Sequence, residues 1–107
     1  MKYIITEDRS KKVAFKLFDA AVGEIRPFEK VDNGTRWIGY TNDFCEQNDT
    51  FLFGIIEDDS NEKPLQVYYW GKAFDMDFLV QTFDEDSARK YLREYIQQYY
   101  DEPIQIF

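Results

Sequence analysis

Apolar residues recur at helical spacing in two segments of the chain. The first segment predicts an amphipathic helix over about 7–22, with Thr6 as its N-cap and Gly23 placed to end it. Its apolar positions are Val13, Ala14, Leu17, Phe18 and Ala21. The second segment predicts a helix over about 84–100 that begins at the N-cap Asp84. Its continuous apolar stripe comprises Ala88, Tyr91, Leu92, Tyr95, Ile96 and Tyr99. Each helix therefore has one face suited to packing against a sheet.

Shorter apolar runs predict the strands. Asn33-Gly34 tolerates the positive φ angles of a type I′ turn and predicts a hairpin between strands at 28–31 and 35–41. The run 51–56 is apolar on both of its alternating faces, which predicts a strand inside the sheet rather than at its edge. Further strands are expected at 2–5, 65–70, 77–83 and 104–107, and loops at 42–50 and 57–63.

These elements predict an α+β fold in a single domain over residues 1–107. A chain of 107 residues is long enough for one core and too short for a second. The order of elements favours an antiparallel sheet of about four to six strands with two helices, at about 7–22 and 84–100, packed on one face. Aromatic residues make up 19% of the chain, and this apolar surface helps to offset the entropy that ordering costs.

The residue types available exclude several kinds of catalysis. There is no histidine, so the chain lacks a Ser-His-Asp or Cys-His arrangement and a zinc site of the usual composition. Cys45 is the single cysteine, and we expect its acidic neighbours Asp43 and Glu46 to raise the pKa of the thiol and oppose nucleophilic use. Neither standard glycine-rich phosphate motif is present.

Carboxylates alone give two weak candidates for chemistry. In a strand, Asp75 and Asp77 would share one face and form a carboxylate pair. The segment 58–62 resembles a calcium loop but lacks the glycine and the final glutamate of an EF-hand. We therefore expect no catalytic residue, no cofactor and no metal, and we interpret the protein as a non-enzyme.

The pattern of apolar runs also bears on location. No run approaches the roughly 20 residues that a membrane helix needs, and the N-terminal apolar stretch is too short for a signal peptide. A single cysteine forms no internal disulfide, which favours a reducing compartment. The expectation is a cytoplasmic protein that does not bind membranes.

Acidic residues are concentrated in one part of the sequence. The net charge is −8; residues 1–41 carry eight basic and six acidic side chains, whereas residues 42–107 carry five basic and fifteen acidic ones. The densest run contains no lysine or arginine and consists of Asp43, Glu46, Asp49, Glu57, Asp58, Asp59 and Glu62. Such a field repels nucleic acid and attracts basic proteins, although acidic surfaces also serve solubility alone.

Aromatic side chains supply a second candidate for contact. Tyr68, Tyr69 and Trp70 are consecutive in a predicted strand, so they cannot all face the same side of the sheet. Unless both faces are covered, some of this aromatic surface is exposed. We therefore assign Tyr68 and Trp70, together with the seven acidic residues of the run, to a protein-interaction surface.

The opening segment carries one resemblance. Lys2-Tyr3-Ile4-Ile5-Thr6-Glu7, followed by a basic amphipathic helix, resembles the start of many small uncharacterised proteins encoded by tailed bacteriophages. The resemblance covers about a fifth of the chain and implies expression in the cytoplasm of a bacterial host. It implies no catalytic or binding residue.

These observations favour a non-enzymatic, acidic module, monomeric or dimeric, that occupies a basic site on a partner protein such as a nucleic-acid-binding protein. Two biological versions fit: a phage-encoded inhibitor of a host nucleic-acid-handling or defence factor, or an immunity protein for a toxic nuclease. One alternative is a phage structural or assembly component acting through oligomer contacts, which requires a large self-complementary apolar patch. The other is a small carboxylate-dependent enzyme, which requires a pocket with converging carboxylates.

Overall fold

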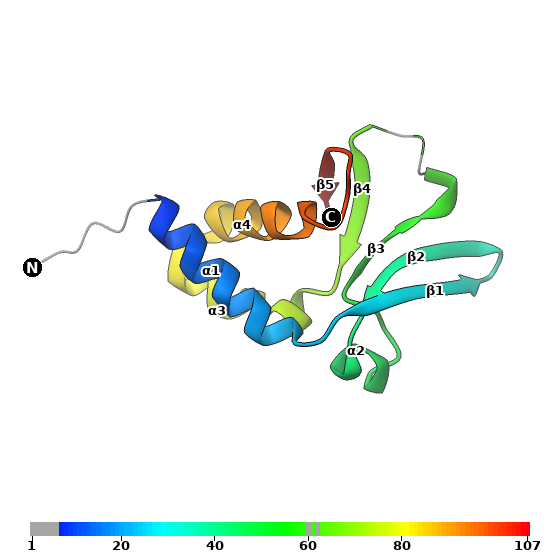
Figure 1. Ribbon diagram of the computed structural model, residues 1–107, viewed down its shortest axis with the longest axis horizontal. Helices are drawn as coiled ribbons and strands as arrows, with labels where there is room; N and C mark the ends of the chain where they lie inside the picture. Colours follow the sequence, from blue (N-terminus) through cyan, green and yellow to red (C-terminus); the bar gives the residue numbers. More distant parts are fainter. Residues whose placement is uncertain (1–6, 60, 62) are drawn as a thin grey trace, which may run out of the picture.

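A computed structural model describes residues 7–59, 61 and 63–107 (Figure 1). In chain order the elements are α1 (Glu7–Val22), β1 (Arg26–Asp32), β2 (Thr35–Thr41), α2 (Asp43–Gln47), β3 (Phe53–Ile56), the 3₁₀ turn η1 (Glu57–Asp59), β4 (Leu65–Tyr69), the 3₁₀ turn η2 (Gly71–Phe74), α3 (Met76–Phe83), α4 (Glu85–Gln97) and β5 (Ile104–Ile106). The strands form one sheet in the order β1-β2-β3-β4-β5. The α+β fold predicted from the sequence is confirmed, and the predicted strand at 2–5 lies outside the described residues.

Both predicted helices are present, and their ends follow the predicted signals. Gly23 adopts a φ of 58° just after α1, and the Asp84 side chain accepts a hydrogen bond from the Ser87 amide at the start of α4 (2.8 Å). The four central residues of the α4 stripe are buried as expected; they are Tyr91, Leu92, Tyr95 and Ile96.

The buried face of α1 differs in part from the prediction. Ala14, Phe18 and Val22 are buried, whereas Val13 is 45% exposed and Ala21 is also exposed. Ala14, Phe18 and Val22 are four residues apart and form one row along the helix. The rest of the molecule covers this row, and the neighbouring row that contains Val13 and Ala21 lies at the margin.

The strand predictions around the hairpin are also confirmed. Asn33 and Gly34 both have positive φ angles, 51° and 80°, as a type I′ turn requires, and they join β1 to β2 in the register Asp32↔Thr35. β3 pairs with β2 on one side and with β4 on the other, so the strand with two apolar faces is the central strand of the five.

Two predicted assignments are wrong. The segment 77–83 is not a strand but the larger part of α3, in which Met76, Leu79, Val80 and Phe83 recur at helical spacing and pack against the core. The segment 42–50 is not wholly a loop, because Asn42 caps α2 by accepting a hydrogen bond from the Cys45 amide (2.8 Å).

The helix α3 also changes the topology of the sheet. β5 pairs with β4 in parallel, with Val67 opposite Ile106, so the sheet is mixed rather than wholly antiparallel. Parallel neighbours need a long crossover, and the segment 70–103, which contains α3 and α4, supplies it.

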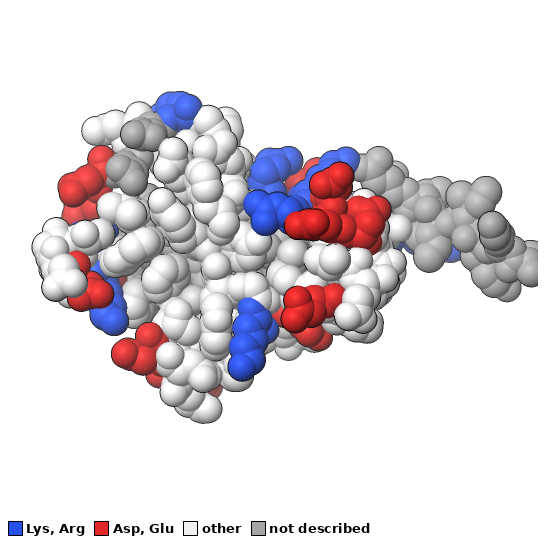
Figure 2. Space-filling model, turned by 180° about the vertical axis from the view of Figure 1, so that it is seen from behind, with Lys and Arg blue, Asp and Glu red and all other residues white. Residues whose placement is uncertain are grey.

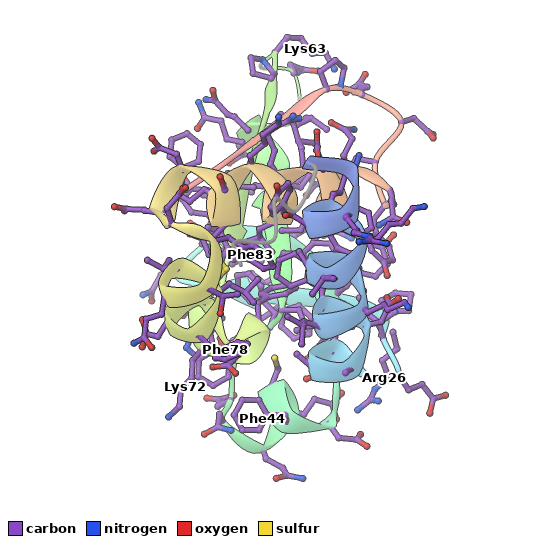
Figure 3. The ribbon with its side chains drawn as sticks, turned by 90° about the vertical axis from the view of Figure 1, so that its left-hand side faces the viewer. Arg26, Phe44, Lys63, Lys72, Phe78 and Phe83 are labelled. Atoms are coloured by element: carbon purple, nitrogen blue, oxygen red, sulfur yellow. The ribbon has the colours of Figure 1, made fainter. Side chains whose placement is uncertain are left out.

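All three long helices lie on one face of the sheet. Figure 3 shows α1 and α3 in front of the strands, and α4 crosses between them and packs against both. The core between these layers is aromatic: Phe18 meets Phe74 edge to face with ring centroids 5.8 Å apart, and Phe53 from β3 lies 6.3 Å from Phe74. No helix in the described part of the chain is both long and apolar enough to cross a membrane.

Candidate functional site

The face of the sheet that points away from the helices carries a row of aromatic side chains. Alternation along each strand sends Val67 and Tyr69 towards the helices and Tyr68 to the opposite face. The register places Phe28 opposite Gly39 on that same face, and Trp37 opposite Lys30. We call the following five residues the aromatic row: Phe28, Trp37, Phe51, Tyr68 and Phe107.

Ring contacts are continuous along the aromatic row. Phe28 stacks on Phe51 with centroids 5.7 Å apart, and Phe51 lies 5.4 Å from Trp37. Trp37 meets Tyr68 edge to face at 5.4 Å, and Tyr68 stacks on Phe107 at 5.6 Å. Such pairs contribute roughly 0.5–1.5 kcal/mol each beyond the burial of their area. The row therefore extends across the sheet from β1 to the residue that follows β5.

Two glycines allow this face to form. Gly39 and Gly54 are directly opposite each other in β2 and β3. A Cβ atom at Gly39 would collide with the carbonyl oxygen of Phe53, and one at Gly54 would lie 2.9 Å from the carbonyl oxygen of Ile38. The two backbones thus approach more closely than any side chain permits, and the space that side chains would fill beside Trp37 and Tyr68 stays free for the rings.

The aromatic row is accessible. Phe107 is 51% exposed and the other four rings are partly buried. The helices α1, α3 and α4 lie on the other face of the sheet. Figure 2 shows a broad uncharged surface on the sheet half of the molecule, with acidic and basic side chains around its margin. Exposed contiguous aromatic surface of this kind is characteristic of an interaction site.

A cavity of about 340 Å³ opens at the β1 end of the aromatic row. Three rings of the row line it, those of Phe28, Trp37 and Phe51. Its charged lining residues are Lys30, Asp32, Glu46 and Asp49. The cavity therefore combines ring faces with carboxylates, which is a suitable environment for a cation.

The fold divides the predicted acidic run into separate groups. α2 and η1 lie at opposite ends of β3 (Figure 1), so the acidic residues before and after this strand point to different ends of the sheet. Asp43 and Glu46 both form ion pairs with Arg26, at 2.8 and 2.6 Å, and these two carboxylates raise the pKa of the Arg26 guanidinium, Glu46 more than Asp43. The sequence run contains no cation, but tertiary structure brings one to it.

The remaining acidic residues of the run differ in their surroundings. Glu57 forms an ion pair with Arg36 at 3.5 Å. Asp49 and Asp58 are exposed and make no ion pair with any described residue. The side chain of Asp59 and the whole of Glu62 lie outside the described part of the structure. Of the seven predicted acidic site residues, Glu46 and Asp49 line the cavity at the aromatic row.

The two predicted aromatic contact residues have different roles. Tyr68 is the central ring of the aromatic row. Trp70 instead stacks on Phe44 of α2, with centroids 5.3 Å apart and an angle of 13° between the rings, and packs partly against the core. Figure 3 places Phe44 on α2, below the layer of long helices. Tyr69 faces inward, where its hydroxyl accepts a hydrogen bond from Arg89 (3.0 Å).

Sequence reasoning missed four rings of the site: Phe28, Trp37, Phe51 and Phe107. A signal for two of them was present in the predicted hairpin. Counting residues outward from the Asn33-Gly34 turn gives the register, and the register places Phe28 and Trp37 on one face of the hairpin. Alternation from the core-facing Ile104 and Ile106 also assigns Phe107 to the open face, whereas alternation from the core-facing Phe53 would assign Phe51 to the helix side, which is wrong.

The structure also shows where Asp75, Asp77 and Cys45 lie, the residues that the sequence offered for chemistry. Asp75, with a φ of 55°, joins η2 to α3, so Asp75 and Asp77 do not form the pair that a strand would align. Cys45 is fully buried, and this burial raises the pKa of its thiol; the expected direction is right, but the cause is desolvation rather than the acidic neighbours. Among the described residues, no three metal-ligating side chains come together.

No protein-family model matches this chain, and neither a curated protein nor a solved structure is significantly similar to it.

Proposed function

We propose that this protein is a non-enzymatic binding module that holds a basic protein partner on the open face of its sheet. The observation that carries the proposal is the aromatic row, whose five rings are in continuous contact and partly exposed. Aromatic residues are the commonest anchors of protein interfaces, because each buries a large rigid area at a small entropic cost.

The charge of the protein favours a basic partner. The net charge is −8, and Asp49 and Asp58 are exposed carboxylates without an ion pair among the described residues. A surplus of negative charge speeds association with basic proteins and disfavours nucleic acid. The rings therefore lengthen the lifetime of the complex, and the carboxylates speed its formation with a basic protein. Both act on the same partner. A phage-encoded inhibitor or an immunity protein is one context for such a module, and this context stays a prediction.

A comparison of captured proteins tests the proposal. The wild-type protein and two double variants are immobilised and exposed to a bacterial lysate at low and high salt. Trp37→Ser/Tyr68→Ser disrupts the aromatic row, whereas Phe44→Ser/Phe78→Ser removes two rings elsewhere on the surface that are more exposed than Trp37 and Tyr68. We expect basic proteins that the wild type and the Phe44/Phe78 variant retain and that the Trp37/Tyr68 variant loses, with weaker capture at high salt. Equal capture by all three proteins would contradict the proposal.

Charge reversal tests the electrostatic part separately. Changing Asp58 and Asp59 to lysine moves the net charge from −8 to −4. Association with a captured partner is expected to slow, and the difference is expected to shrink as salt rises, because the Debye length is only about 8 Å at physiological ionic strength. An association rate that responds to neither change would leave the acidic surface as a solubility feature.

Self-association is the second candidate function, because an apolar row on an open face also suits a second copy of the chain. Sedimentation of the wild type and of Trp37→Ser/Tyr68→Ser distinguishes the two. An oligomer that the variant abolishes, together with no captured protein, would favour an assembly component over a partner-binding module.

A further inference from the structure

We infer that the cavity at the β1 end of the aromatic row binds an arginine side chain of the partner. The inference rests on the proposed function and names the group by which the partner is recognised. It is based on two independent properties of one cavity of about 340 Å³: three aromatic rings, and two carboxylates, those of Asp32 and Asp49, that form no ion pair with a described residue. The volume is at the lower end of the roughly 300–1,000 Å³ range of ligand pockets and suits one side chain.

The rings provide the flat surface that a guanidinium group prefers. Phe28 and Phe51 stack at an angle of 26°, and the Trp37 ring lies 5.4 Å from that of Phe51. The negative face of an aromatic ring attracts a cation within about 6 Å of its centroid, most strongly when the ring is tryptophan. A guanidinium is planar and weakly hydrated, so it stacks on such rings more readily than the compact ammonium of lysine.

The carboxylates provide the hydrogen-bond acceptors. Asp32 ends β1 and Asp49 precedes β3, and neither forms an ion pair with a described residue. An arginine that enters the cavity from solvent would donate its N–H groups to these carboxylates while its plane lies on the rings.

The third acidic residue of the lining is already occupied. Glu46 accepts from Nε of Arg26 at 3.1 Å with one oxygen and contacts an Nη of Arg26 at 2.6 Å with the other. Arg26 also donates to Asp43, so this internal arginine is fixed by two partners and leaves the cavity to another cation.

Lys30 is the one basic residue of the lining, and it opposes a guest cation. Its single charge shares the lining with the carboxylates of Asp32 and Asp49, neither of which forms an ion pair with a described residue. The inference therefore predicts effects of opposite sign at neighbouring positions: removing an acidic group weakens binding, and removing the Lys30 charge strengthens it. A site for an anion would show the reverse pattern.

Nuclear magnetic resonance provides the test, because the chain has two tryptophans. The indole N–H resonance of Trp37 reports on the cavity, and that of Trp70, which stacks on Phe44, is an internal control. The probes are end-capped peptides of four arginines, four lysines or four citrullines, and an oligothymidylate of similar length. We expect the arginine peptide to shift the Trp37 resonance at low salt, to bind about threefold or more tightly than the lysine peptide, and to leave Trp70 unchanged.

Three single variants sharpen the test. Asp49→Asn is expected to lower the affinity for the arginine peptide about three- to fivefold, as loss of one exposed ion pair does. Lys30→Gln is expected to raise the affinity for the arginine peptide by a similar factor. Asp101→Asn makes the same charge change as Asp49→Asn at an exposed position outside the cavity and is expected to have little effect.

Several results would overturn the inference. One is a Trp37 shift that is as large with the citrulline peptide as with the arginine peptide, and another is a Trp70 shift as large as that of Trp37. Tighter binding of the lysine peptide or of the oligonucleotide, or no shift with any probe, would also contradict it. So would weaker binding of the arginine peptide to Lys30→Gln. If the arginine peptide does not shift the Trp37 resonance while capture of partners still depends on Trp37 and Tyr68, the proposed function stands and only the inferred arginine site is wrong. If capture does not depend on these rings, the proposed function fails whatever the peptides show.

Discussion

The two faces of the sheet are both aromatic, yet they differ in what covers them. On the helix side, Phe18, Phe53 and Phe74 are at most 1% exposed and meet one another and Tyr95 in a closed core. On the other side, the aromatic row is partly exposed along its whole length. The same residue types therefore perform two tasks: on one face they hold the helices to the strands, and on the other they form a surface without a described layer above it.

An apolar strand with two apolar faces, such as β3, indicates a central position but does not indicate that both faces are covered by protein. Burial of apolar area stabilises a fold by about 25 cal/mol per Å². Rings that remain partly exposed provide less of this stabilisation, and the remainder becomes available when a partner covers them.

The largest expected difference between the faces concerns a buried charge. Ile96 is fully buried on the helix side, and Ile96→Asp is expected to unfold the domain, since an unpaired carboxylate there costs about 4 kcal/mol or more. Trp37→Asp, on the open face, is expected to leave a folded protein with a loss of roughly 1–2 kcal/mol. Far-ultraviolet circular dichroism and urea unfolding measure both. A folded Ile96→Asp protein of unchanged stability would contradict the assignment of the covered face.

Hydrogen exchange is expected to separate the centre of the sheet from its edge. β3 is paired on both sides, whereas β1 is an edge strand that carries Pro27 and several charged residues. The amides of β3 are expected to be among the slowest in the molecule, and the outward amides of β1 to exchange at least about a hundredfold faster. Exchange measured by nuclear magnetic resonance checks this order, and fast exchange throughout β3 would show that the central strand is not stable.

A smaller effect is expected at alkaline pH, and it arises on the covered face. Burial and a hydrogen bond donated to Asp19 (2.7 Å) raise the pKa of the Tyr95 hydroxyl, and burial followed by the charge of Tyr40 raises that of Tyr100. Folding therefore favours the neutral phenols. Their contribution to stability is fully present below the usual tyrosine pKa of about 10 and is lost as the pH rises above it. The urea midpoint is expected to be lower at pH 11 than at pH 7, and Tyr95→Phe is expected to reduce this difference. An equal midpoint at both pH values would contradict the burial of these hydroxyls.

The smallest effect is expected at Tyr100. Its hydroxyl is buried and has no hydrogen-bond partner among the described residues. Tyr100→Phe removes this unsatisfied group while keeping the ring, and it is expected to leave the free energy of unfolding unchanged or to raise it by up to about 1 kcal/mol. Denaturant unfolding at neutral pH measures the change. A loss of more than 1 kcal/mol would show that the hydroxyl has a partner.

The parts of the fold that follow from local signals could be predicted. Positive φ at Asn33 and Gly34, the cap at Asp84 and the stripe along α4 each depend on residues close together in sequence. The segment 77–83 could not be assigned from the sequence, because seven residues with several adjacent apolar positions fit a strand and a helix alike. That error propagated, because a strand in place of α3 would interrupt the helical connection 70–103 that joins β4 to its parallel neighbour β5.

In the candidate site, too, some features follow from local sequence signals and others depend on tertiary structure. Tyr68 could be selected from alternation within its own strand. The ion pairs of Asp43 and Glu46 could not be predicted, because they depend on Arg26, which is far from both in sequence and reaches them only because it pairs with Thr41 just before α2. The five-ring contact of the aromatic row likewise exists only after the strands have paired in register.

The glycine pair at positions 39 and 54 determines which substitutions this chain can accept. On an open sheet face, most positions tolerate exchange, since a new side chain simply extends into solvent. Position 39 does not, because even a methyl group meets the backbone of the neighbouring strand. Alanine there would force β2 away from β3 and so separate Trp37 from Tyr68. A position with no side chain and no ring contact of its own thus limits the variation of the whole surface as strictly as a core residue does.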